Sequence, residues 1–344
     1  RLNDDGVLEY RFLTICGVCS HGAWGAGFLK GWSENGTRPE FRIVTGMSAG
    51  AMLAPAAFLG AEYDYVLEDI FTARENKDFY NLTTWSVIRG LFGRGHFADF
   101  SPGRELLAEV LSVSLIDRVA EEYTKGRRLY IATANFDDNS WTVWDMGAIA
   151  ASGRPDRIER FREVIAAAVA VPGAFPPVYF PVTVDGETYG QMHLDAGTHF
   201  VFVEDYMAGV DVELFAAGYG HEDIVPVAYV IMNTQSELQF AAPPSGQPLE
   251  LITRAYQRIG RYASYGALDK LYAAALEDDV PMQIAAIPNN LDIDIDVFEF
   301  AQPGMSTLFA EGYQAAVNGY DWYARPSDIP DYREDVIFED VSLP

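Results

Sequence analysis

The chain has 344 residues, of which 49% are hydrophobic, so it is long enough to bury a large core and is neither disordered nor fibrous. Its 50 acidic residues against 24 basic residues give a formal net charge of -26. Such a surface repels phosphate backbones and anionic bilayers at long range. We therefore expect no nucleic-acid partner, and we expect any contact with a membrane surface to be local and hydrophobic.

The first 60 residues predict two strand–turn–helix units. Residues 10–15 are apolar and β-prone, and they lead through a glycine-containing turn to a helix over 23–32. A second strand, 41–45, meets a sharp turn at 46–50 and then a helix of small and apolar residues over 51–59. Repeated units of this kind favour βαβ construction and a largely parallel sheet.

The middle of the chain predicts helices, then two strands, then one amphipathic helix. Residues 62–125 have the pattern of helices joined by loops, and we expect them to form a helical cap. Strands follow at 128–134 and 141–146, separated by a turn rich in Asp and Asn. Apolar residues from 161 to 168 follow the i, i+3, i+4, i+7 spacing of an amphipathic helix.

The C-terminal half continues the alternation of strands and helices. The run 224–232 is almost wholly apolar, as in a strand covered on both faces. The other strands are predicted at 178–184, 191–194 and 282–287, and helices near 249 and over 307–320. The pattern predicts one domain over residues 1–344: a three-layer α/β/α sandwich with a mostly parallel central sheet.

The strongest chemical motif is Gly46-Met47-Ser48-Ala49-Gly50, between a predicted strand and a predicted helix. A nucleophilic serine projects from a tight turn of this kind, and its neighbours must be small. The alternative is a helix start at which Ser48 serves as the N-terminal cap. The strand–turn–helix context favours the nucleophile. Only about one βα unit precedes Ser48, whereas several precede the nucleophile in α/β-hydrolases, so we expect a different serine-hydrolase family.

Four segments form a combined pattern: 16–27 (CGVCSHGAWGAG), the turn 46–50, residues 166–178 (AAAVAVPGAFPPV), and 192–197 (MHLDAG). Together they resemble the patatin-like phospholipases, and particularly their bacterial lipoprotein-like members, with 16–27 at the place of that family's glycine-rich oxyanion loop. Their order and spacing agree with the family, and the resemblance extends from about residue 8 to 322.

The resemblance implies a patatin-like fold and a Ser–Asp dyad without histidine. Ser48 would attack the acyl carbonyl of a phospholipid or simpler ester and form an acyl-enzyme, while Asp195 takes its proton. The main-chain N–H groups of Gly17, Val18 and Cys19 would form the oxyanion loop. No metal or other cofactor is implied, the oligomeric state stays open, and the lipoprotein-like members point to the bacterial envelope. The residues that complete the motifs are Gly22, Gly46, Gly50 and Gly197.

The oxyanion loop departs from the family pattern at three positions. Val18 and Cys19 replace glycines, and His21 replaces a Lys or Arg. Every residue except proline supplies a main-chain N–H, but a β-branched Val18 is strained if its position requires positive φ. A neutral His21 also removes a fixed positive charge. The second hypothesis is therefore a catalytically impaired pseudo-hydrolase that acts as a lipid-binding or interaction module.

Histidines and a cysteine pair offer further alternatives. His193 and His199 flank Asp195, so a Ser–His–Asp triad is conceivable, while Asp195 itself has the alternative role of a turn residue before Gly197. Cys16 and Cys19 form a C-x-x-C that suggests redox control of the loop. No second Cys or His pair completes a zinc site, and no other metal-binding spacing occurs.

Two further groups of residues have mainly structural interpretations. Gly22, Gly25 and Gly27 do not make a dinucleotide fingerprint, and we expect them to allow close packing of a helix on the sheet. Aromatic and aliphatic residues in the predicted cap are candidates for an acyl pocket or for the core: Trp85, Ile88, Leu91, Phe92 and Phe97.

Overall fold

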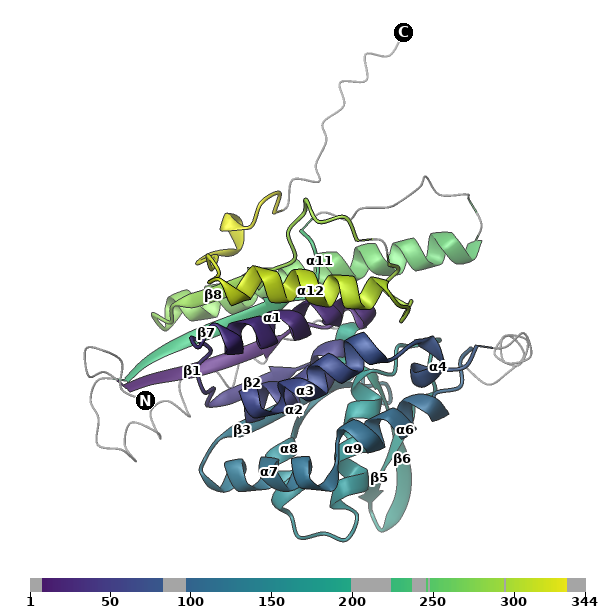
Figure 1. The fold of residues 1–344 in the computed structure, drawn as a ribbon. Coiled ribbons are helices and arrows are strands. Elements are labelled where there is room, and N and C mark those ends of the chain that lie inside the picture. The colour runs from purple at the N-terminus through teal and green to yellow at the C-terminus, as the bar shows by residue number, and fades with distance from the viewer. Residues whose placement is uncertain are drawn as a thin grey trace.

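The computed structural model describes residues 8–82, 97–198, 224–236, 246, 248–293 and 295–332. In this part of the chain the strands form one sheet in the order β5-β6-β3-β2-β1-β7-β8, with β4 paired to β3 (Figure 1). The strands are β1 (Leu8–Ile15), β2 (Ile43–Gly46), β3 (Arg128–Asn135), β4 (Ser140–Asp145), β5 (Val178–Val184), β6 (Glu187–Asp195), β7 (Ile224–Met232) and β8 (Met282–Ala286). All the strands predicted from the sequence are present.

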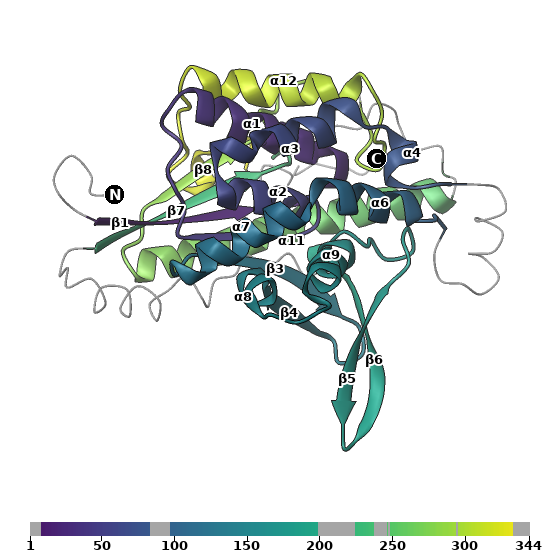
Figure 2. The same ribbon diagram turned by 60° about the horizontal axis from the view of Figure 1, so that its bottom comes forward.

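The centre of the sheet is parallel and one end is antiparallel. Strands β3, β2, β1, β7 and β8 run parallel to one another, whereas β4 and β6 run antiparallel to β3 and β5 antiparallel to β6. The hairpin of β5 and β6 projects from the body of the protein (Figure 2). The predicted mostly parallel sheet is confirmed.

Helices cover the two faces of the sheet. They are α1 (Gly22–Glu34), α2 (Ala49–Leu59), α3 (Asp64–Glu68), α4 (Asn76–Phe79), α6 (Ser101–Val110), α7 (Val113–Thr124), α8 (Met146–Ala151), α9 (Arg157–Ala168), α11 (Pro248–Glu277) and α12 (Gly304–Val317). The views in Figures 1 and 2 place α1, α2 and α12 on one face of the parallel strands and α11 on the other. This is the predicted three-layer α/β/α arrangement.

The two hydrophobic clusters follow from the alternation of side chains along the strands. On β1, Leu13 and Ile15 belong to the cluster beneath α1 and α2, whereas Phe12 belongs to the cluster beneath α11. All three side chains are almost fully buried. Both faces of the central strands are therefore covered, which explains their nearly continuous apolar sequences.

Two local predictions are corrected by the structure. The strand predicted over 141–146 ends at Asp145, because the Asp145 carboxylate accepts the Ala148 N–H at 2.8 Å and caps helix α8. Gly27 was expected to pack on the sheet, but it packs on a helix instead. A Cβ at Gly27 would collide with the Phe309 carbonyl of α12, so this glycine brings α1 and α12 together.

Candidate active site

Ser48 occupies a strained turn between β2 and α2. Its backbone has φ 50° and ψ -131°, in a region that L-residues rarely adopt. Although Ser48 stands at the N-cap position of α2, its side chain makes no capping hydrogen bond. Its hydroxyl lies instead beside the carboxylate of Asp195, where it favours the ionised form of that group. The capping alternative is therefore wrong, and the turn has the geometry of a nucleophile elbow.

The small residues of the turn are required by close approaches. A Cβ at Gly46 would collide with the main chain of Gly50, and a Cβ at Gly50 would collide with the Ile15 carbonyl of β1. Gly22 lies behind the turn, where a Cβ would approach the Cβ of Ala49 to 3.1 Å. The turn can thus pack tightly against the end of β1 only with glycine at these positions.

The register of β3 explains why Ser48 and Asp195 meet. Gly46, the last residue of β2, pairs with Ile131, and Asp195, the last residue of β6, pairs with Thr133. Strand β4 occupies one edge of β3, alongside the residues of β3 that pair with β2 and those that pair with β6. Strands β2 and β6 must therefore both lie on the other edge of β3. The two strands therefore end facing each other, two positions apart along β3. The turn after β2 and the carboxylate at the end of β6 converge at this point.

Asp195 is buried, with 2% of its surface exposed. One carboxylate oxygen accepts the Gly197 N–H at 2.7 Å, so the predicted turn role of Asp195 coexists with its contact to Ser48. Its own N–H donates to the Ala170 carbonyl at 2.9 Å, which ties it to the small-residue segment after α9. Burial raises the pKa of Asp195 to about 6, despite the two hydrogen bonds, which favour the ionised form.

The loop after β1 wraps around Ser48. A Cβ at Gly17 would collide with the Ser48 side chain and lie 2.8 Å from its Oγ. The N–H groups of Gly17, Val18 and Cys19 make no hydrogen bond to any residue that the structure describes. Val18 is extended at φ 175°, so the expected strain at this β-branched residue is absent. Cys19 has the positive φ, 41°, and carries the strain instead.

His21 does not supply the positive charge that a Lys or Arg would supply at this position. Its Nε2 lies 3.2 Å from the Ile295 carbonyl, so Nε2 carries the hydrogen. Burial lowers the pKa of His21 and keeps the ring neutral. The neighbouring Ser20 donates its hydroxyl to the Asp296 and Val297 carbonyls at 3.0 and 3.1 Å. The far end of the loop is therefore held by hydrogen bonds to residues 295–297.

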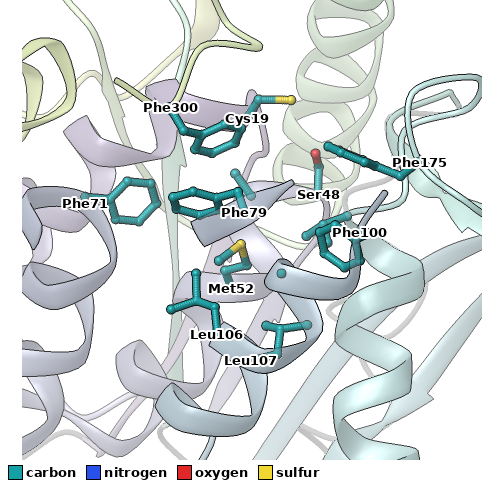
Figure 3. Close-up of a pocket in the computed structure, with 13 residues that line it drawn as sticks. Cys19, Ser48, Met52, Phe71, Phe79, Phe100, Leu106, Leu107, Phe175 and Phe300 are labelled. Atoms are coloured by element: carbon teal, nitrogen blue, oxygen red, sulfur yellow. The ribbon is translucent and has the colours of Figure 1, made fainter. Parts of the chain in front are cut away.

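An apolar pocket opens beside Ser48 and encloses about 520 Å³ of empty space, part of it continuous with solvent. Figure 3 shows phenylalanine rings gathered around the serine. Among the lining residues that the structure describes, Ser48 is the only one with a hydroxyl group. The others are Cys19, Ala49, Met52, Phe71, Phe79, Phe100, Gly103, Leu106, Leu107, Val169, Phe175 and Phe300.

Apart from Ser48, Cys19 and Ala49, the residues that line the pocket were not predicted from the sequence as pocket residues. Of the predicted candidates, Phe97 does not line the pocket, and Trp85, Ile88, Leu91 and Phe92 lie outside the described residues. The rings come from segments as distant as Phe71 and Phe300. The apolar Pro-rich segment that contains Phe175 was the one sequence signal near the pocket, since it belongs to the third patatin-like segment.

His193 is not a partner of Ser48. Its Nδ1 lies 2.8 Å from the Thr133 hydroxyl, and its Nε2 lies 3.2 Å from Gln191 Oε1. Because an amide oxygen only accepts, Nε2 carries the hydrogen and Nδ1 of the neutral ring accepts from the Thr133 hydroxyl, which itself accepts from Trp144 Nε1 at 2.7 Å. Burial lowers the pKa of His193. The triad through His193 is therefore wrong, and His199 lies outside the described residues.

The two cysteines have different surroundings. Cys16 belongs to the hydrophobic cluster beneath α11, whereas Cys19 packs against the other cluster. Both thiols are free. Burial raises the pKa of Cys16 to about 12 and also raises that of Cys19, so neither thiol is activated toward oxidation. These surroundings give no support to redox control of the loop.

In the ranges that the structure describes, no group of three His, Cys, Asp or Glu side chains is arranged to hold a metal ion. The helices in those ranges include none with the length and apolar character needed to span a bilayer.

A strained serine at a strand–helix turn, a buried carboxylate and an apolar pocket are features that serine acyl-hydrolases with an α/β/α fold share. Comparison with family models gives a match to "Patatin-like phospholipase" over residues 13–204, more than half of the chain. The chain therefore belongs to the patatin-like phospholipase family, whose members are generally lipid acyl hydrolases. This confirms the resemblance found in the sequence.

Comparisons with curated proteins and with solved structures add no evidence on function. No curated protein matched the chain. Among solved structures, "Crystal structure of VipD from Legionella pneumophila" aligns with a TM-score of 0.37 at 13% identity, covering 92% of this chain and 69% of that one. That similarity is too low to support any inference about activity.

Proposed function

We propose that this protein is a serine acyl-hydrolase that cleaves lipid acyl esters through Ser48 and Asp195. The observation that carries the proposal is the placement of the Ser48 hydroxyl beside the buried Asp195 carboxylate, at the facing ends of β2 and β6 and next to an apolar pocket. A carboxylate of ordinary pKa is a weak base toward an alcohol. Burial makes Asp195 a stronger base, while it remains ionised above about pH 6.

The reaction proceeds in two stages. Ser48 Oγ attacks the ester carbonyl, its proton passes to Asp195, and the N–H groups of residues 17–19 bind the oxyanion. When the tetrahedral intermediate collapses, the proton from Asp195 goes to the departing alcohol, leaving an acyl-enzyme. A water molecule then attacks the acyl-enzyme and gives its proton to Asp195. The released Ser48 recovers that proton as the carboxylic acid forms.

The pocket suggests where the acyl chain binds. Its lining is almost entirely hydrocarbon and includes Phe71, Phe79 of α4 and Leu106 of α6, all within the predicted cap 62–125. We infer that this segment shields the acyl chain from water and acts as the cap. Contact with a lipid surface would be hydrophobic, because a net charge of -26 opposes approach to an anionic bilayer.

The test uses nitrophenyl esters together with a fluorophosphonate probe. The wild-type protein should hydrolyse nitrophenyl butyrate and become labelled at Ser48, as identified by mass spectrometry. Ser48→Ala should lose both properties while retaining the wild-type unfolding temperature. Absence of labelling and hydrolysis in correctly folded wild-type protein would remove the proposal.

The oxyanion loop favours a second candidate, a pseudo-hydrolase that binds lipid without turnover. Cys19 holds a strained positive φ where the family has glycine, and neutral His21 replaces a basic residue. If the loop is impaired, glycine at 18 and 19 should raise ester hydrolysis at least tenfold. Equal activity in wild type and Val18→Gly/Cys19→Gly would count against impairment.

A further inference from the structure

Asn233 lies at the end of β7, on the side of β1 opposite the nucleophile turn. Because β1 is paired with β2 on one edge and β7 on the other, the loop after β1 lies between Ser48 and Asn233. Asn233 is fully buried, and neither its sequence context nor the family motifs single it out. Its position nevertheless gives it direct access to the start of the oxyanion loop.

Several hydrogen bonds fix the residue that begins this loop. Asn233 Nδ2 donates to the Cys16 carbonyl at 2.6 Å. The Cys16 N–H donates to the Ile231 carbonyl at 2.9 Å. The Cys16 thiol also interacts with the Asn233 main chain and the Ser264 hydroxyl. Cys16 is thus held on its amide, carbonyl and side chain, and Asn233 holds the carbonyl.

The carbonyl of Cys16 and the N–H of Gly17 belong to one planar peptide group. In a trans peptide these two groups point in opposite directions, so a donor that fixes the carbonyl also fixes the N–H. The Gly17 N–H therefore points away from Asn233, and Gly17 packs directly on Ser48. This is the side on which the oxyanion of a substrate attached to Ser48 would form.

We propose that Asn233 is a positioning residue that aims the Gly17 N–H at the oxyanion. The proposal rests on the acyl-hydrolase function proposed above, and it adds a residue outside the dyad and the loop. Asn233 acts through the peptide and does not touch the substrate.

The surroundings of the Asn233 side chain agree with a role as a donor. Its Oδ1 has no hydrogen-bond partner among the described residues, which is a cost to stability that an apolar side chain would avoid. A Cβ at Gly25 would collide with that oxygen and lie 3.1 Å from Asn233 Cγ. Gly25 therefore leaves the room that Asn233 needs to reach the Cys16 carbonyl.

The kinetic test is Asn233→Leu, which keeps a similar volume and removes the donor. We expect kcat for nitrophenyl butyrate to fall about 100-fold, as for a misplaced catalytic group, while KM changes less than threefold. The pH at which activity is half-maximal should stay the same, because the Ser48–Asp195 pair is untouched. An increase in KM at unchanged kcat would overturn the proposal.

Gln235→Leu is the matched control. Gln235 is also a buried amide, but its Nε2 donates to the Pro288 and Leu291 carbonyls, at 2.9 and 2.7 Å, and not to the oxyanion loop. Its kcat should stay within threefold of wild type. Equal losses in the two variants would show a general packing effect. If Asn233→Leu does not fold, Asn233→Ala, which removes the donor without adding bulk, replaces it.

Crystal structures of the wild type and of Asn233→Leu test the positioning role of Asn233 independently of the acyl-hydrolase activity. The Cys16–Gly17 peptide should rotate in Asn233→Leu, whether or not the wild type is active. An inactive wild type with a rotated peptide in the variant would refute the hydrolase function and leave the positioning contact supported. An unrotated peptide in the variant would overturn the proposal even in an active enzyme.

Discussion

Gly17 packs against Ser48 so closely that any side chain at position 17 would meet the serine: its Cβ would lie 2.8 Å from Ser48 Oγ. Neighbouring positions in the loop tolerate larger residues, since Val18 is extended and Cys19 lies at the pocket wall. The family has glycine at positions 17, 18 and 19. At position 17 the contact with Ser48 requires glycine.

Gly17→Ala should therefore lower kcat for nitrophenyl butyrate at least 100-fold, because the methyl group displaces Ser48 or its oxyanion donors. The measurement is steady-state hydrolysis together with the rate of fluorophosphonate labelling. Gly266→Ala on α11 is the control, since a Cβ there meets no atom within 4 Å. Hydrolysis by Gly17→Ala within a few-fold of the wild-type rate would contradict the packing argument.

The activity should rise with pH through the pKa of Asp195. As the general base, Asp195 must be ionised, and burial raises its pKa to about 6. We expect kcat/KM to have a midpoint near pH 6 and to fall about tenfold for each pH unit below it. Initial rates with a nitrophenyl ester between pH 4.5 and 8, corrected for nitrophenol ionisation, measure this profile.

His193→Gln tests whether a histidine causes the same pH dependence. His193 bonds to Thr133 and Gln191 and does not contact Ser48, so the midpoint should persist in this variant. If kcat/KM of folded His193→Gln no longer rose with pH, the Ser–His–Asp triad would again be a candidate.

Asp195→Asn should stabilise the folded protein increasingly as pH rises toward 8. The pKa of Asp195 is raised from 3.8 to about 6, so between these values the folded state holds a proton that the unfolded state has lost. The stabilising contribution of that proton is therefore lost as pH rises through 6. Between pH 5 and 8, the unfolding free energy of the variant should gain about 1.4 kcal/mol relative to wild type.

Urea unfolding at the two pH values measures this difference, and Asp195→Asn should be inactive at both. Because the comparison is between pH values, hydrogen bonds altered by the substitution itself cancel. A difference between variant and wild type that does not change with pH would show that Asp195 has an ordinary pKa.

The sequence predicted the sheet and the turn around Ser48 through local patterns. Strand β7 was visible as an apolar run, and the turn around Ser48 as a cluster of small residues between a strand and a helix. The convergence of Ser48 and Asp195 was not predictable from periodicity, because it depends on β2 and β6 sharing one edge of β3. Only the resemblance to the family linked the two residues.

The pocket and the support of the loop depend on contacts that sequence patterns do not encode. Phe71 and Phe300 line the same pocket as Ser48 although 229 positions separate them (300 − 71). Asn233 follows an apolar strand and has no motif around it. Val18 would be strained only at positive φ, and the identity of its side chain does not determine which residue of the loop takes that conformation. Cys19 takes that conformation.

The pocket beside Ser48 should set the preferred acyl-chain length. Leu107 of α6 lines the pocket and is buried, so Leu107→Trp would fill part of the space available to a chain. We expect kcat/KM for nitrophenyl decanoate to fall at least tenfold, while that for the acetate ester changes less than threefold. Ala108→Trp, on the exposed side of the same helix, should leave both unchanged. Equal loss for the two esters in Leu107→Trp would mean that the acyl chain binds elsewhere.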